Sequence, residues 1–204
     1  YFKKNKSSAS SSNPVIRYET EPGEQGQFDW KESIPFILRD TGERITVNIL
    51  GLLMGNSRLR VYKPSLWMTQ DILIHLLVEC FESLGGVPRV LLTDNMRTVM
   101  DEARTQSRKG KVNARFAAFA KDFGFKLVPC IAASPKTKGK VESQMKYLDE
   151  IKAYSGKLTL VELFELVERI NNRVNNTICQ GTGRIPIIEF EKERPFLLPL
   201  PNES

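Results

Sequence analysis

The order of strand and helix patterns along this chain is the feature that most restricts its fold. Three strand-like segments come first, at residues 26–34, 44–54 and 57–62, and Gly55-Asn56 is typical of a hairpin break between the last two. After residue 69 the patterns alternate between helix and strand. Successive strands followed by such alternation predict one mixed α/β sheet with helices packed on it.

The later segments show apolar residues at helical spacing, with recognisable ends. Thr69 begins one helix that Gly85-Gly86 stops, and Thr159-Leu-Val-Glu162 has the capping-box pattern of the last one. We expect helices at residues 69–84, 111–123, from the loop after 134 to about 154, and 159–174, with short strands at 89–93 and 125–130. The order β-β-β-α-β-α-β-α is that of a ribonuclease-H-like fold, a mixed five-stranded sheet flanked by helices.

Composition changes at both ends of the chain. Residues 1–13 are polar and rich in Lys and Ser, so we expect a disordered arm and not a signal peptide. Residues 14–180 carry the strand and helix patterns and form the predicted ribonuclease-H-like core. The four prolines at 185–201 predict that residues 181–204 form an extended C-terminal tail, packed on the core or leading out of it.

Residue usage narrows the possible chemistry. One histidine, His75, and three widely separated cysteines argue against a Cys/His metal site and against most nucleophile–His schemes. No apolar run approaches the roughly 18 residues that span a membrane, and we expect a cytoplasmic protein. The net charge of +6 favours a polyanionic partner, although a merely basic surface would give the same value. An enzyme of this composition would rely on carboxylates.

Three carboxylates occupy unusual positions. Asp29 lies inside an apolar first strand, where an ionised group is costly without a partner. Asp94 follows the strand at 89–93, and ligands of open α/β sheets bind at that end of a strand. Glu142 is expected in the first turn of a helix after a Lys-rich loop. The intervals of 65 (94 − 29) and 48 (142 − 94) residues allow the three side chains to meet on the sheet surface.

Converging carboxylates repel one another unless cations lie between them. Two Mg²⁺ ions, with Mn²⁺ as a substitute, would meet that need because Mg²⁺ prefers oxygen ligands. Such a pair, roughly 3.5–4 Å apart, can hold the attacking and leaving oxygens of a phosphodiester. Spacing alone does not decide the matter, since the 24 acidic residues allow many triplets and Asp94-Asn95 is also a common strand-to-turn pair.

The sequence around each acid is more specific. The segments PGEQGQFDW, LTDN and SPKTKGKVE, which contain Asp29, Asp94 and Glu142, together resemble the DDE transposase/retroviral integrase superfamily. PGEQGQFDW and TDNMR are similar to insertion-sequence transposases of the IstA type, and the resemblance runs from about residue 15 to 201. Most relatives have Gly where this chain has Met96, and the second interval is longer than in retroviral integrases. These departures argue against a retroviral integrase in particular, and they do not affect the assignment of Asp29, Asp94 and Glu142.

The resemblance implies that Asp29, Asp94 and Glu142 are the catalytic metal ligands of a polynucleotidyl transferase. It implies DNA as the substrate, both transposon ends and target, with water or a 3′-hydroxyl attacking phosphorus. It also implies a homo-oligomeric full-length enzyme and an AAA+ ATPase helper of the IstB type. Family members carry an N-terminal helix-turn-helix region and a C-terminal β-rich domain that this chain does not show, so we expect a catalytic core. A purely hydrolytic nuclease and a non-catalytic nucleic-acid-binding module of the same fold stay open as alternatives.

Basic residues near the acids are candidates for DNA contact. These are Lys136, Lys138, Lys140, Gln144, Lys146 and Arg97. Lys146 lies one helical turn after Glu142, and it could instead form an ordinary i,i+4 pair worth about 0.2–0.5 kcal/mol. Met145 and Leu148 are expected on the opposite, inward face. Arg97 begins a basic segment, residues 97–121, whose first part is typical of a mobile loop, and a solvated loop without a partner would show the same pattern.

Overall fold

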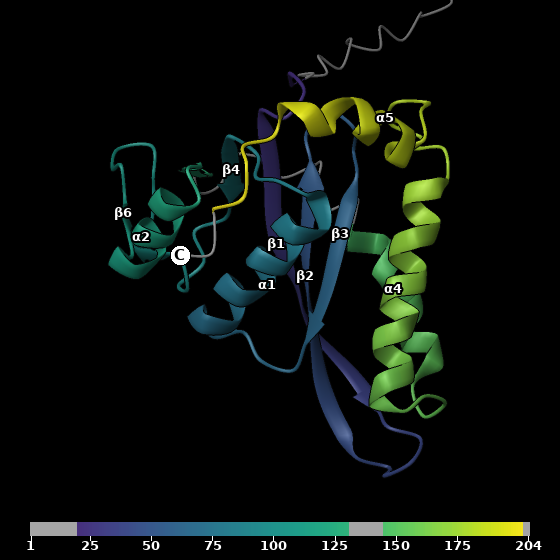
Figure 1. Ribbon diagram of the computed structural model, residues 1–204. Helices are drawn as coiled ribbons and strands as arrows, with labels where there is room; N and C mark the ends of the chain where they lie inside the picture. Colours follow the sequence, from purple (N-terminus) through teal and green to yellow (C-terminus); the bar gives the residue numbers. More distant parts are fainter. Residues whose placement is uncertain (1–19, 131–144, 202–204) are drawn as a thin grey trace, which may run out of the picture.

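A computed structural model describes residues 20–130 and 145–201 of the chain. Its centre is a five-stranded sheet in the order β3-β2-β1-β4-β7 (Figure 1). The strands are β1 (Gln25–Ile37), β2 (Arg44–Met54), β3 (Arg60–Ser65), β4 (Val90–Thr93) and β7 (Lys126–Pro129). The first three pair antiparallel, whereas β4 joins β1 and β7 joins β4 in parallel. This mixed sheet confirms the predicted α/β architecture.

Helices cover both faces of the sheet. Helices α1 (Gln70–Leu84) and α2 (Ala114–Asp122) lie on one face, over a core that includes Phe28, Leu52 and Phe81. The short 3₁₀ helix η1 (Lys146–Tyr154) and α4 (Leu160–Asn176) lie on the other, over a core that includes Ile49, Leu148 and Val167 (Figure 1). Alternate residues of β2 therefore pack into two separate cores, as the two-residue period of a strand requires. In β1 the first part of the strand packs into one core, and the part beyond the register shift between Lys31 and Ile34 packs into the other.

The predicted helix ends are confirmed for α1 and α4. The Thr69 side chain accepts a hydrogen bond from the Ile72 N–H, and Gly85 ends α1 with φ at 72°, in the left-handed region that suits glycine. Thr159 and Glu162 form both halves of the capping box at the start of α4. The sequence signals at these ends are local, so no tertiary information was needed to predict them.

The prediction of a helix from residue 111 is wrong at its start. Residues Lys111–Val112 form β6, which pairs antiparallel with β5 (Met100–Glu102), and the segment between them is a hairpin. Helix α2 begins only after Asn113, whose side chain accepts a hydrogen bond from the Arg115 N–H. This cap separates the polar hairpin from the amphipathic helix.

The prediction of an extended C-terminal tail is also wrong in part. Residues Pro186–Glu193 form helix α5, followed by the short 3₁₀ helix η2 (Arg194–Phe196), across the end of the sheet (Figure 1). Pro186 occupies the first helical turn, where the missing N–H costs no hydrogen bond. Phe190 is buried in the core with α1, so this segment covers the sheet.

Three further points concern the limits of the elements. Strand β3 begins at Arg60, three residues later than predicted, and β1 continues past a register shift between Lys31 and Ile34. The expected disordered arm, residues 1–13, lies outside the described residues. No helix in the two described ranges is both long enough and apolar enough to cross a membrane.

Candidate active site

Asp29 lies in the middle of β1, on the face that carries η1 and α4. Its neighbours Phe28 and Trp30 are buried on the opposite face, so Asp29 points away from them by strand alternation. One Asp29 carboxylate oxygen, Oδ1, accepts a hydrogen bond from the Trp30 N–H at 2.8 Å. The side chain is half-buried, and its partner in β2 is Gly51, which has no side chain to cover it.

Asp94 follows the last residue of β4, next to β1. The parallel register of these strands pairs Gly26 with Leu91 and Gln27 with Leu92. Two more residues along each chain bring Asp94 alongside Asp29, and adjacent strands lie about 4.8 Å apart. The structure therefore brings together two of the three predicted acids.

Glu142 lies outside the described residues, as do Lys136, Lys138, Lys140 and Gln144. The described chain resumes at Met145, whose thioether packs against Gly51: a Cβ built on Gly51 would lie 3.0 Å from Met145 Sδ and closer still to Cε. Met145 and Leu148 are buried, which confirms their predicted inward face.

An ion pair also holds η1 against β1 near Asp29. Lys31, two residues after Asp29 in β1, donates to Asp149 Oδ1 at 2.9 Å. The hydrogen bonds from Lys31 and Lys152 lower the pKa of the Asp149 carboxyl from its ordinary value. Two contacts, one apolar and one ionic, thus fix the start of η1 over the strand that carries Asp29.

Comparisons of sequence place the chain among known proteins, although no protein-family model matches it. Over 204 residues it is 49% identical to the transposase for insertion sequence element IS232 of Bacillus thuringiensis subsp. berliner, covering all of this chain and 47% of that protein. Over 172 residues it is 34% identical to a putative transposase for IS5376 of Geobacillus stearothermophilus, covering 84% and 40%. Over 198 residues it is 26% identical to the transposase for IS21 of Pseudomonas aeruginosa, covering 92% and 48%.

Comparisons of structure agree on the fold. The catalytic core domain of BIV integrase superposes with a TM-score of 0.57 at 16% identity, over 85% of this chain and 97% of that one. The HTLV-2 integrase catalytic core domain in complex with magnesium (dimeric form) superposes with a TM-score of 0.58 at 14% identity, over 83% and 97%. The chain belongs to the DDE transposase/retroviral integrase superfamily. Its fold is the predicted ribonuclease-H-like fold, and it spans about half the length of the curated relatives it matches.

Asn95 positions the end of β4 in this superfamily member, a role that the sequence did not predict. Its side-chain amide donates to the Cys130 carbonyl at 3.0 Å and its Oδ1 accepts from the Arg104 N–H at 2.7 Å. The Cys130 N–H in turn donates to the Thr93 carbonyl at 2.7 Å. These bonds join the ends of β4 and β7 to the hairpin beside Asp94. The Asp94-Asn95 pair can be recognised in the sequence, but the hydrogen-bond partners of Asn95 come from other segments of the chain.

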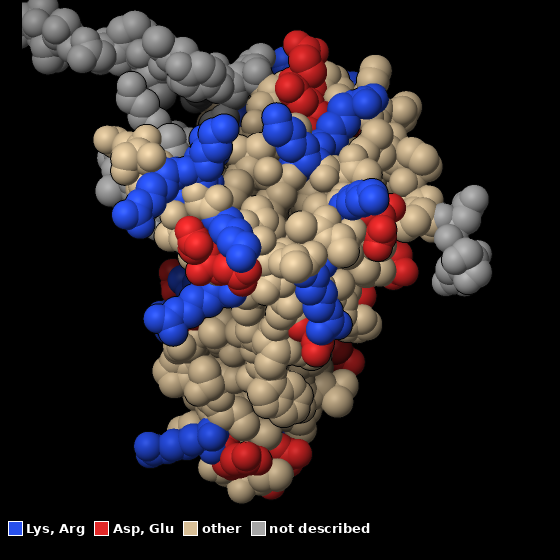
Figure 2. All heavy atoms as spheres, turned by 90° about the vertical axis from the view of Figure 1, so that its left-hand side faces the viewer, with Lys and Arg blue, Asp and Glu red and all other residues tan. Residues whose placement is uncertain are grey.

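Basic side chains gather on the side of the molecule formed by α2 and the β5–β6 hairpin. Figure 2 shows this side, with acidic side chains next to several of the Lys and Arg. The exposed basic residues of this segment are Arg97, Arg108, Lys109, Lys111, Arg115 and Lys121. Arg104 instead turns inward to the Pro129 carbonyl, and Arg115 pairs with Asp71. Arg97 and, on η1, Lys146 are exposed, as DNA contact would require.

The remaining polar candidates have ordinary surroundings. His75 is exposed on α1 and lies 3.0 Å from Glu79, as an ordinary surface histidine does. Within residues 20–130 and 145–201, no three His, Cys, Asp or Glu side chains are grouped so as to hold a metal ion. Glu142, the third acid of the predicted site, is not among those residues.

Proposed function

We propose that this chain is the catalytic core of a DNA transposase that cleaves and joins DNA strands with Asp29, Asp94 and Glu142 as ligands of two divalent cations. The observation that supports the proposal is the register of β1 and β4, which pairs Gln27 with Leu92, two residues before Asp29 and Asp94. Two neighbouring carboxylates repel each other when both are ionised. A cation between them would remove that cost.

The path of the chain supports Glu142 as the third ligand. Only two residues lie between it and Met145, and the three steps along the chain span at most about 11 Å. Met145 packs on Gly51, the β2 partner of Asp29. This short interval along the chain from a residue that packs beside Asp29 supports Glu142 as a ligand of the same site.

The donor set fits magnesium. Carboxylate oxygens are the ligands that Mg²⁺ and Mn²⁺ accept, and no histidine or thiol is needed. When bound, two such ions would lower the pKa of the attacking water or 3′-hydroxyl and neutralise the charge on the leaving oxygen. Asp29, in β1, and Asp94, directly after β4, would supply two of the ligands, and Glu142 would supply the third. Asn95 and the Lys31–Asp149 pair hold the supporting backbone in place.

DNA is the substrate in this proposal, in the form of transposon ends and a target. Arg97 and Lys146 are exposed and can contact phosphates, and Lys136, Lys138, Lys140 and Gln144 adjoin Glu142 in the sequence. Such contacts are insensitive to base sequence and weaken with salt. Similarity to the transposase for IS21 favours an AAA+ helper ATPase of the IstB type, and the dimeric integrase core favours a homo-oligomer.

A strand-joining assay with Mg²⁺ tests the proposal. Wild-type protein should produce joined strands, and Asp29→Asn, Asp94→Asn and Glu142→Gln should each lose both cleavage and joining by several orders of magnitude while their melting temperatures persist. Asp40→Asn, the same change on an exposed turn, should keep full activity. Nicks without joining would identify a hydrolytic nuclease, and DNA binding without any cleavage would identify a non-catalytic module.

A further inference from the structure

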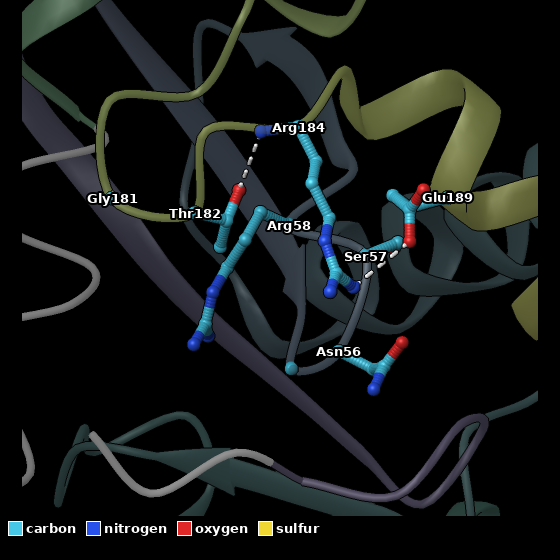
Figure 3. A pocket seen from close by; sticks show the side chains of 8 residues that line it. Asn56, Ser57, Arg58, Gly181, Thr182, Arg184 and Glu189 are labelled. Atoms are coloured by element: carbon cyan, nitrogen blue, oxygen red, sulfur yellow. Dashed lines mark hydrogen bonds and ion pairs between the residues drawn. The ribbon is translucent and has the colours of Figure 1, made fainter.

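A small polar pocket lies between the β2–β3 turn and the loop before α5, away from the proposed catalytic acids (Figure 3). It is lined by Gly55, Asn56, Ser57, Arg58, Gly181, Thr182, Arg184 and Glu189. Arg58 comes from the β2–β3 turn and Arg184 from the loop before α5, and in Figure 3 the two side chains extend in the same direction. The two segments are more than 120 residues apart in sequence, so the pocket exists only in the folded chain.

The charge of the lining favours an anion. Glu189 is shared between Arg184, at 3.2 Å, and Lys192, at 2.7 Å, so one carboxylate serves two cations. The lining itself therefore carries two arginines, Arg58 and Arg184, and one carboxylate, Glu189. Arginine presents several N–H donors in one plane, a geometry that suits the oxygens of a phosphate group.

Buried groups hold the wall formed by the β2–β3 turn. Glu193 is fully buried and accepts hydrogen bonds from the Ser57 N–H at 2.9 Å and from the Gly23 N–H at 3.0 Å. Asn56 donates to the Thr20 carbonyl at 2.8 Å. This turn is fixed before any ligand arrives, so little ordering entropy opposes binding.

The opposite wall is fixed by the next arginine along the chain. Arg60 is 2% exposed and donates to the Val174 carbonyl at 3.3 Å and to Cys179 Sγ at 3.7 Å. The Cys179 N–H bonds to the Arg184 carbonyl at 2.8 Å, and the Gly183 N–H bonds to the Cys179 carbonyl at 2.7 Å. Arg60 thereby connects the strand after Arg58 to the loop that carries Arg184.

The backbone conformation at Arg58 is a second observation, independent of charge, that points to a functional role for this side chain. Its φ is 65°, in the left-handed region where Gly or Asn is the common choice. Residues held in such conformations cluster at ligand sites, because the surrounding structure must enforce them.

We propose that this pocket binds a backbone phosphate of the DNA substrate, a proposal that rests on the proposed function. The Gly55 N–H bonds to the Gln25 carbonyl at 2.7 Å, and Gln25 lies four residues before Asp29 in β1. At about 3.3 Å per residue, the pocket lies about 13 Å along the strand from the catalytic acids. That length corresponds to about four phosphates of one strand at 3.4 Å of helix axis each. Arg184 is two-thirds exposed, so a duplex can reach the pocket from outside.

The experiment measures binding of a short DNA duplex over a salt series, for wild type, Arg58→Gln, and Arg184→Gln combined with Glu189→Gln. The paired change keeps the net charge and removes the guanidinium. Arg39→Gln is the matched control, because it removes one positive charge from an exposed residue just beyond the far end of β1. Each pocket variant should weaken binding at least threefold and lower the slope of log affinity against log salt by about 0.9 for each phosphate that the variant no longer neutralises. The control should leave the slope unchanged.

Equal effects of Arg58→Gln and Arg39→Gln would overturn the proposal, since only net charge would then matter. Full binding by the charge-neutral Arg184/Glu189 variant would also overturn it. A rise in melting temperature with inorganic phosphate at constant ionic strength, lost in Arg58→Gln and accompanied by unchanged DNA binding, would assign the pocket to free phosphate instead. The joining assay is a separate readout: a wild type that binds DNA but never joins it refutes the proposed function and leaves the pocket result standing.

Discussion

Gly51 lies directly opposite Asp29 across the β1–β2 pair. The absence of a side chain at Gly51 leaves room for Met145, the third residue after Glu142, to pack there. Gly51 thus lets the start of the described chain after the gap, at Met145, approach the strand pair that carries Asp29. A larger residue would separate them.

Gly51→Ala should therefore reduce strand joining more than it reduces stability. The new Cβ would meet the flexible end of Met145, so we expect a stability loss of about 1–3 kcal/mol and an activity loss of tenfold or more. Urea unfolding and the joining assay measure the two effects. Adding Met145→Ala to Gly51→Ala should restore part of the activity that the single change loses. If the two changes are simply additive, the packing of Met145 on Gly51 does not position the segment.

The side-chain amide of Asn95 should affect strand joining because it holds the end of β4, which Asp94 follows. Asn95→Ala removes bonds to Cys130 and Arg104 and leaves buried groups unsatisfied, for a loss of about 1–3 kcal/mol in unfolding free energy. Joining should fall further than stability does, because the end of β4 loses its anchor. Asn176→Ala, which removes a bond within one exposed helical turn, is the control and should leave activity unchanged. Equal effects of the two substitutions on joining would remove Asn95 from the site.

How much the sequence could predict depended on how local each signal is. Strand β2 has the predicted bounds of residues 44–54, and Thr69, Gly85 and Thr159 end their helices as expected, because each signal lies within a few residues. Helix α5 was missed because its prolines favour extended chain locally, whereas burial of Phe190 against α1 stabilises the helix.

The functional residues also fall into two groups, those that the local sequence predicts and those that only the fold brings together. Asp29 and Asp94 were predicted from strand position and motif, and the sheet register brings them together. The role of Asn95 could not be predicted, because its partner Cys130 lies 35 residues away. The proposed phosphate pocket could not be predicted for the same reason, since Arg58 and Arg184 line one pocket only in the folded chain.

The ion pair between Lys31 and Asp149 predicts a specific pH dependence. Lys31 and Lys152 hold the pKa of Asp149 below its ordinary value of 3.8, so its stabilisation is present above that pH and is lost as the pH falls through the lower folded value. At neutral pH, Asp149→Asn should cost about 0.2–1 kcal/mol, because the pair is partly exposed. Urea unfolding across pH should show this difference vanishing in acid. A difference that is independent of pH would contradict the ion-pair account.

The effect of Mn²⁺ on melting temperature tests the three-carboxylate site most directly. A ligand that binds only the folded state stabilises it, so millimolar Mn²⁺ should raise the melting temperature of the wild-type protein. The triple variant Asp29→Asn, Asp94→Asn, Glu142→Gln lacks the repulsion, so it should melt higher than wild type without metal and gain little when Mn²⁺ is added. A variant that gains as much from Mn²⁺ as the wild type does would place the ions elsewhere and contradict the account.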